Sequence, residues 1–194
     1  MTAARILGIG GTTRPGSTAE NALRHALACA RGAGAETRLL CGGDLTLPPY
    51  AGVVETEAAR RLVDALRWAD GLIISTPSYH GLMSGLLKNA LDYAEELRQD
   101  TRCYLDGRAV GCIVCADGIQ AMGSTLGELR SLIHALRAWP IPAAACVQSQ
   151  QRPFDPDPER PEAQVAAQLA RVAAQVVEFA DRHREHRPSL ALCA

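Results

Sequence analysis

The chain has 194 residues, of which 47% are hydrophobic, and 20 basic against 21 acidic residues give a formal net charge of −1. This balance argues against a nucleic-acid-binding protein and against the strongly charged docking face typical of small electron carriers. No apolar run approaches the roughly 18 residues that a membrane span needs, and no charged-then-apolar leader opens the chain, so we expect a cytoplasmic protein.

Strand-like and helix-like segments alternate along the chain. Short apolar runs predict five strands, at residues 5–9, 37–40, 72–74, 109–115 and 143–147. Apolar residues at helical spacing predict five helices, over residues 19–30, 56–69, 86–97, 125–139 and 161–179. The strand at 37–40 has polar neighbours, which is typical of a sheet edge. The segment that follows residue 74 is predicted to be a loop.

Three of the predicted helices have start signals. Ser17 with Glu20, and Thr125 with Glu128, have the spacing of capping boxes, and Ser84 is placed to cap the helix over 86–97. This alternation of strands and helices predicts an α/β fold, a doubly wound five-stranded parallel sheet with helices on both faces. We expect one domain over residues 1–183 and a loose tail over 184–194.

The loop after the first strand has the composition of an anion site. A strand enters a turn rich in Gly, Thr and Ser, and a helix starts directly behind it, which aims backbone N–H groups at one point. A nucleoside-triphosphate loop would need Lys after Gly16, where Ser17 stands, and a dinucleotide fingerprint would need Gly at Thr13. Hydroxyls with the single cation of Arg14 suit a terminal monophosphate, although an ordinary strand–helix turn has the same appearance.

Seven cysteines show no disulfide-scaffold spacing. Cys112 and Cys115 form a CxxC pattern, but they fall within a predicted strand, where residues three apart point to opposite faces. We expect small buried thiols there and no metal site.

Two motifs, taken together, resemble those of a known family. The first is Gly11-Thr12-Thr13-Arg14-Pro15-Gly16-Ser17, and the second is Thr76-Pro77-Ser78-Tyr79-His80-Gly81 followed by Gly85-Leu86-Leu87-Lys88-Asn89-Ala90-Leu91-Asp92. With these motifs the chain resembles the NAD(P)H-dependent FMN reductase family over approximately residues 5–147. The resemblance implies a flavodoxin-like sheet of order 2-1-3-4-5, with FMN and NADPH or NADH as cofactors.

The resemblance also implies three segments that contact FMN. The phosphate would be held by residues of the first loop, namely Gly11, Thr12, Thr13, Arg14, Gly16, Ser17 and Thr18. The edge of the isoalloxazine ring would lie along Pro77, Ser78, Tyr79, His80 and Gly81, and its pyrimidine side would meet Ala116, Asp117 and Gly118.

This chain departs from the family pattern at four of these or neighbouring positions. Ala19 stands where Asn is frequent, and Asp117 interrupts a turn that is usually rich in Ser and Gly, so we expect its carboxylate to point outward. Ser78 replaces the usual Glu, and His80 replaces the usual Asn. His80 is the candidate catalytic residue, as a hydrogen-bonding partner or a proton donor near neutral pH, and its alternative role is that of an exposed loop residue.

The implied reaction is hydride transfer from nicotinamide to flavin N5 and onward to a small-molecule acceptor such as free flavin, a quinone or an azo dye. The implied partners are a flavin-dependent monooxygenase and a second copy of the chain, in a homodimer or homotetramer. Three alternatives remain: a tailoring flavoenzyme that reduces one metabolite, a non-catalytic FMN electron carrier, and a flavin-free α/β binding domain.

Overall fold

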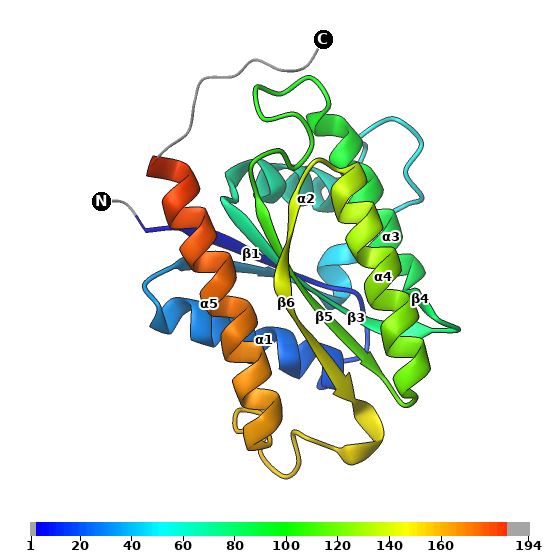
Figure 1. Cartoon of the computed structure of the whole chain (residues 1–194). Helices are drawn as coiled ribbons and strands as arrows, with labels where there is room; N and C mark the ends of the chain where they lie inside the picture. Colours follow the sequence, from blue (N-terminus) through cyan, green and yellow to red (C-terminus); the bar gives the residue numbers. More distant parts are fainter. Residues whose placement is uncertain (1–2, 186–194) are drawn as a thin grey trace.

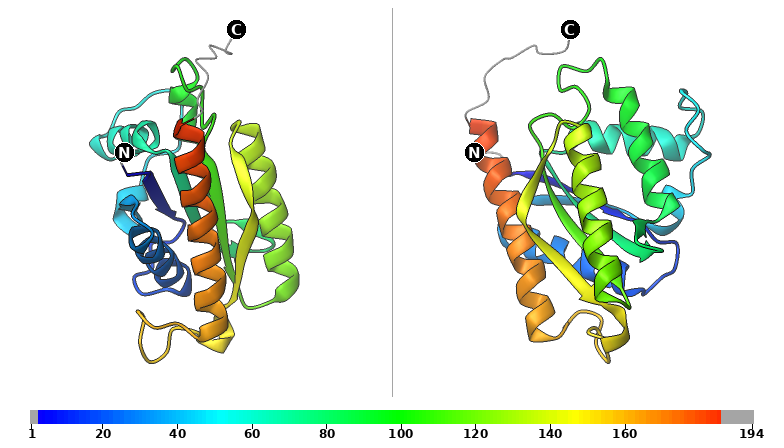
Figure 2. Two further views of the ribbon diagram at one scale, coloured as in Figure 1. Left: turned by 60° about the vertical axis from the view of Figure 1, so that its left-hand side comes forward. Right: turned by 45° about the vertical axis from the view of Figure 1, so that its right-hand side comes forward.

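The protein is a three-layer α/β structure, in which a parallel sheet lies between two layers of helices (Figure 1 and Figure 2). This computed structural model describes residues 3–185, so the predicted tail lies outside the described residues from residue 186 onward. Helices α1 (Thr18–Gly32) and α5 (Ala163–Glu185) cover one face. Helices α2 (Glu57–Trp68), α3 (Gly85–Asp92) and α4 (Ile119–Ala135) cover the other.

The described strands are β1 (Arg5–Gly10), β2 (Glu36–Leu40), β3 (Gly71–Tyr79), β4 (Leu82–Met83), β5 (Ala109–Ala116) and β6 (Trp139–Gln148). Short 3-10 helices cover Gly42–Leu45, Tyr93–Leu97 and Ser149–Gln151. The main sheet has the order β2-β1-β3-β5-β6, and its neighbouring strands are parallel. Without β4, this is the predicted order 2-1-3-4-5, so the predicted doubly wound sheet is confirmed, with β2 at its edge.

Each face of the sheet has its own hydrophobic core. Ile6, Ile73 and Cys115 pack with the apolar stripes of α1 and α5. Leu7 and Cys112 pack against the helices of the opposite layer. The alternation along β1 and β5 follows from the two-residue period of a strand, and it explains why the central strands are apolar on both sides.

The two cysteines of the CxxC pattern lie on opposite faces of β5, as predicted. Burial raises the pKa of the Cys112 thiol and of the Cys115 thiol, in each case to about 12. Both groups are therefore neutral thiols at neutral pH, and their separation by the sheet leaves them unable to act as a pair.

The prediction that residues 75–81 form a loop is wrong for most of that segment. β3 continues to Tyr79, pairs with β5 as far as the register of Pro77 with Cys115, and then turns back so that Ser78 pairs with Met83 of β4. The polar residues did not end the strand because their hydroxyls find partners: Ser75 Oγ donates to the carbonyl of Ala19 at 2.7 Å.

The predicted bounds of the fourth helix are also wrong. α4 begins at Ile119, so Thr125 lies within the helix, fully buried, and its hydroxyl is 2.7 Å from that of Ser78. The helix ends at Ala135, after which Arg137 adopts a φ of 63° and β6 begins at Trp139. Thr125 and Glu128 therefore do not form a capping box; both contact the β3–β4 hairpin. Thr125 does so through Ser78, and Glu128 Oε2 accepts the N–H of Met83 at 2.9 Å.

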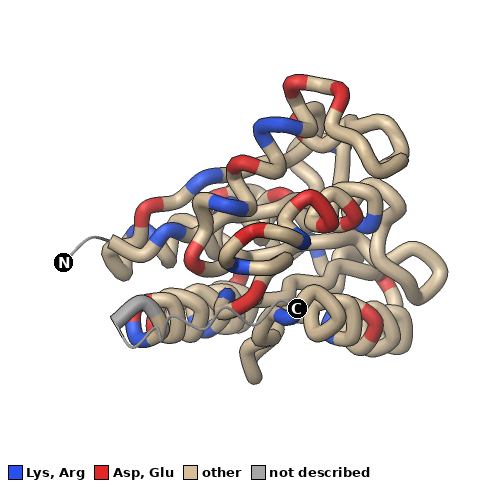
Figure 3. The backbone as a smooth tube through the Cα atoms, turned by 90° about the horizontal axis from the view of Figure 1, so that it is seen from above, with Lys and Arg blue, Asp and Glu red and all other residues tan. Residues whose placement is uncertain are grey.

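Charged residues of both signs alternate along the surface elements seen in Figure 3. Five of the ion pairs within residues 3–185 join neighbours on the same helix, among them Lys88 with Asp92 and Arg60 with Glu57. Within residues 3–185, no helix is long and apolar enough to cross a membrane.

Candidate functional site

The candidate site is built around Gly11, the residue that follows the end of β1. The N–H of Gly11 donates to the carbonyl of Ser75 on β3 at 2.7 Å, and the carbonyl of Gly11 accepts from Ser84 Oγ at 2.6 Å. Ser84 also caps α3, since its Oγ accepts the N–H of Leu87 at 3.2 Å. A Cβ at position 11 would lie 2.8 Å from Ser84 Oγ, so the close approach requires glycine. The first loop thus leaves the sheet at a fixed place.

The loop from Thr12 to Thr18 presents hydrogen-bond donors that have no partner in the protein. Thr12 Oγ1 accepts the N–H of Arg14 at 3.1 Å, and Ser17 Oγ accepts the N–H of Glu20 at 3.3 Å, so both hydroxyl protons are available to donate. Within the part of the chain that the structure describes, the N–H groups of Thr13, Thr18 and Ala19 donate to no protein atom. The last two belong to the first turn of α1, a helix of 15 residues. Free donors and a helix N-terminus together suit an anionic ligand.

The charged side chains of this loop have different surroundings. Arg14 is exposed beside the free donors, with no ion pair recorded within residues 3–185. Glu20 turns back toward the loop: its Oε2 accepts the N–H of Gly16 at 3.0 Å, and its Oε1 accepts from Arg24 at 2.6 Å. The capping box predicted for Ser17 and Glu20 is therefore half formed, because the carboxylate caps Gly16 instead of Ser17.

The second predicted segment forms the tip of the β3–β4 hairpin. Tyr79 is 59% exposed, and the neighbouring Leu82 is 55% exposed. His80 is exposed and has a φ of 56°, the left-handed conformation that lets the chain reverse, while Gly81 follows with a φ of 84°. Pro77 is half-buried beside β5. The tip therefore presents an aromatic ring, an apolar side chain and an imidazole to the same edge of the sheet.

Ser78 is placed differently from its neighbours. Its hydroxyl lies 2.7 Å from that of Thr125 and donates to the carbonyl of Ala121 at 3.3 Å. Both partners belong to α4, so this side chain joins the hairpin to the helix and does not face the open edge. A ligand at the edge would meet Ser78 through its backbone.

The third predicted segment leads from β5 into α4. Ala116 is buried, whereas Asp117 and Gly118 are exposed, as expected for a carboxylate that points outward. The carbonyl of Asp117 accepts from Gln148 Nε2 at 3.0 Å. Gly118 is the N-cap of α4 and offers no side chain to the first N–H groups of the helix. This helix N-terminus is a second group of free donors at the same edge.

The structure adds a segment that the sequence analysis missed. The loop after β6 returns to the start of α1, and the two enclose a cavity of about 170 Å³ lined by Gly16, Thr18, Asn21, Ser149, Arg152, Pro153, Phe154 and Asp155. Arg152 has a φ of 47° and lies 3.9 Å from Asp155. No motif marked this loop, because only the packing of α5 against α1 brings it beside the first loop.

Next to the first loop, Cys41 Sγ lies 3.8 Å from both Glu20 Oε1 and Arg24 Nη2. Burial, followed by the charge of Glu20, raises the pKa of this thiol, so it is a neutral group at neutral pH.

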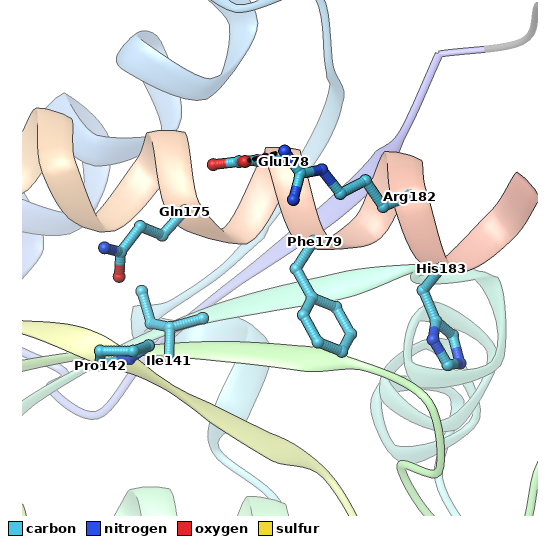
Figure 4. Close-up of a pocket in the computed structure, with 7 residues that line it drawn as sticks. All are labelled: Ile141, Pro142, Gln175, Glu178, Phe179, Arg182 and His183. Atoms are coloured by element: carbon cyan, nitrogen blue, oxygen red, sulfur yellow. Dashed lines mark ion pairs between the residues drawn. The ribbon is translucent and has the colours of Figure 1, made fainter. Parts of the chain in front are cut away.

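A larger cavity of about 450 Å³ lies elsewhere, between the beginning of β6 and the second half of α5. Figure 4 shows its apolar floor of Ile141 and Phe179 beside the ion pair of Arg182 with Glu178. It is at the amino end of β6, whereas the candidate site lies beyond the carboxyl ends of the strands. We give it no part in the chemistry of that site.

Comparisons with known proteins identify the family of this chain. Residues 4–152 match the NADPH-dependent FMN reductase family. The chain is 25% identical over 186 residues to the NADPH-dependent FMN reductase ArsH of Shigella flexneri, covering 96% of this chain and 72% of that protein. It is 40% identical over 74 residues to an FMN-dependent NADPH-azoreductase of Staphylococcus aureus, which covers 38% of this chain and 36% of the azoreductase.

A solved structure shows the same architecture over most of the chain. The apo form of an NADH:FMN oxidoreductase (EMOB) superposes with a TM-score of 0.73 at 25% identity, covering 93% of this chain and 90% of that one. The family match and the three loops at the carboxyl edge of a flavodoxin-like sheet lead to one conclusion. The chain belongs to the NADPH-dependent FMN reductase family and is a flavin oxidoreductase that uses FMN and a nicotinamide dinucleotide.

Proposed function

We propose that FMN lies across the carboxyl edge of the sheet, with its phosphate in the loop of residues 11–18, and that its electrons pass to a small-molecule acceptor. The observation that supports this most directly is the set of unpartnered donors at the start of α1. They lie at the same edge as the hairpin tip and the start of α4, which is where a ligand of a doubly wound sheet is expected.

In this proposal the phosphate is held by hydroxyl and backbone donors with one cation. Thr12 and Ser17 donate through their hydroxyls, and Thr13 and Thr18 donate through their N–H groups. Arg14 contributes the positive charge. The free backbone N–H of Ala19 also donates to the phosphate. The family pattern has an Asn side chain at this position, which this chain lacks.

The ring of FMN would lie between the hairpin tip and the start of α4. Tyr79 supplies an exposed aromatic face, and Pro77 in β3 and Gly81 in the turn shape the hairpin beside it. The backbone of Ala116, Asp117 and Gly118 would meet the polar side of the ring, where the free N–H groups of α4 stabilise negative charge. Ser78 contributes only through its backbone.

FMN, when bound, accepts a hydride from the nicotinamide and delivers electrons to the second substrate. The protein has to hold the two rings in register and exclude water, which requires no nucleophile. His80, at the exposed turn of the hairpin, is positioned to hydrogen-bond an acceptor or to donate a proton to it. The similarity to an azoreductase favours azo compounds as acceptors, and quinones and free flavin are the other small-molecule acceptors that we propose.

A tailoring flavoenzyme for one metabolite is the second candidate, because Ser78 and His80 depart from the family pattern next to the proposed ring. A carrier without its own reductase activity is disfavoured by the mixed charges of the surface in Figure 3. A flavin-dependent monooxygenase remains the proposed protein partner if free reduced flavin is the product.

An anaerobic titration tests the proposed function. Addition of FMN to the purified chain should give a bound-flavin spectrum, and addition of NADPH or NADH should bleach it at a catalytic rate. A bound flavin that no nicotinamide reduces would favour the carrier, and a chain that binds no FMN would overturn the proposal.

Arg14→Ala should weaken FMN binding by about 1.5–3 kcal/mol, because the phosphate would lose a charged hydrogen bond from the guanidinium. Arg31→Ala is the matched control, since Arg31 lies in the last turn of α1, at the far end of that helix from the loop. Isothermal titration should give equal FMN affinities for Arg31→Ala and the wild type. An unchanged affinity in Arg14→Ala would remove Arg14 from the site.

His80→Asn should leave FMN affinity unchanged and shift the relative kcat/KM values for a panel of quinone, azo and flavin acceptors. Asn is among the residues that tolerate the left-handed conformation at position 80, so the hairpin keeps its shape. His134→Asn, on the exposed surface of α4, is the control. Identical acceptor profiles in all three proteins would show that His80 is only a loop residue.

We also propose a homodimer or homotetramer, with α3 at the interface and the nicotinamide pocket lined by two subunits. Sedimentation velocity should give a dimer or tetramer at micromolar concentration. A monomer over the whole accessible concentration range would contradict this assembly.

A further inference from the structure

The carboxylate of Glu20 lies at the mouth of the first loop, among donors that suit an anion. It occupies the third position of α1, its side chain is 13% exposed, and its Oε2 accepts the N–H of Gly16 at 3.0 Å. Asn21 Nδ2 donates to the carbonyl of Gly16 at 3.2 Å. The Gly16 N–H is therefore already satisfied by a negative charge of the protein.

Arg24 balances this charge. Its Nε and Nη2 atoms lie 2.9 and 2.6 Å from Glu20 Oε1, and this hydrogen bond raises the pKa of the guanidinium. The loop thus has one free cation, Arg14, and one ion pair, Glu20 with Arg24. A phosphate bound to the free donors would be attracted by Arg14 and by Arg24, and repelled by Glu20.

We infer that Glu20 and Arg24 are a pair that sets how tightly the loop holds the FMN phosphate, with Glu20 weakening the binding. This inference rests on the proposed function, because it requires the phosphate to lie in this loop. Its consequence is an FMN that exchanges with solution, which suits an enzyme that releases reduced flavin.

A purely structural role for the pair makes a different prediction. If the ion pair served only to shape the loop, loss of either partner would disturb the donors and weaken FMN binding. If Glu20 acts through its charge, loss of that charge strengthens binding, whereas loss of Arg24 leaves the charge unbalanced and weakens binding. Glu20→Gln separates these roles because the amide oxygen of Gln can still accept the N–H of Gly16.

The experiment measures the affinities of FMN and of riboflavin by flavin-fluorescence titration in the wild type, Glu20→Gln, Arg24→Ala and Glu36→Gln. Riboflavin lacks the phosphate and reports whether the ring site is intact. Glu36→Gln changes net charge by the same amount at the start of β2, the opposite end of the sheet from the loop. The titrations are made at low and high salt, because screening weakens interactions between exposed charges.

Glu20→Gln is expected to bind FMN roughly fivefold more tightly than the wild type, the effect of one unit charge a few ångströms away near water. Arg24→Ala is expected to bind FMN more weakly, riboflavin affinity is expected to stay constant, and the gain in Glu20→Gln is expected to shrink at high salt. An FMN affinity of Glu20→Gln that is equal to or lower than that of Glu36→Gln would overturn the inference. So would an equal change in riboflavin affinity, because it would place the effect outside the phosphate.

The wild type separates failure of this inference from failure of the proposed function. A wild type that prefers FMN to riboflavin, with no gain in Glu20→Gln, would leave the phosphate in the loop and remove only the role of Glu20. A wild type that binds FMN and riboflavin equally would remove the phosphate from the loop, and the inference would fall with it.

Discussion

The Gly11 peptide is held from both sides, since its N–H donates to the carbonyl of Ser75 and its carbonyl accepts from the hydroxyl of Ser84. These two bonds join β1, β3 and α3 at the place where the chain leaves the sheet. Ser84 and Ser75 are fully or almost fully buried, so neither bond competes strongly with water. An unpaired polar group in their place would cost about 1–3 kcal/mol, which makes the position of the first loop a consequence of core packing.

Helix α4 has the corresponding role for the other half of the site. The hydroxyls of Ser78 and Thr125 meet inside the protein, and Glu128 accepts the N–H of Met83, so the hairpin is attached to α4 at two points. The same helix begins at Gly118, beside β5. The hairpin tip and the third loop are therefore positioned by one rigid element. This leaves His80 and Tyr79 exposed at an otherwise fixed edge.

Local sequence patterns predicted the elements that are apolar and regular. The apolar run of residues 109–115 gave β5 to within one residue, and the stripe of α1 gave its buried face of Ala19, Ala22, Leu23, Ala26, Leu27 and Ala30. Patterns failed where polar residues have partners distant in sequence. Ser75 extends β3 because α1 supplies an acceptor, and Thr125 lies inside a helix because Ser78 supplies a partner 47 residues away.

By itself, the sequence determined the parallel sheet with helices on both faces and the membership of the FMN reductase family, and it predicted that residues 11–18 bind an anion. These follow from hydrophobic periods, from glycines and hydroxyls next to a strand, and from short motifs, all of which are local properties. Only the tertiary structure decided that Ser78 faces α4, that the carboxylate of Glu20 caps Gly16, and that the loop after β6 borders the start of α1. Each of these depends on which distant group lies within hydrogen-bond distance, and that is fixed by the packing of whole elements against one another.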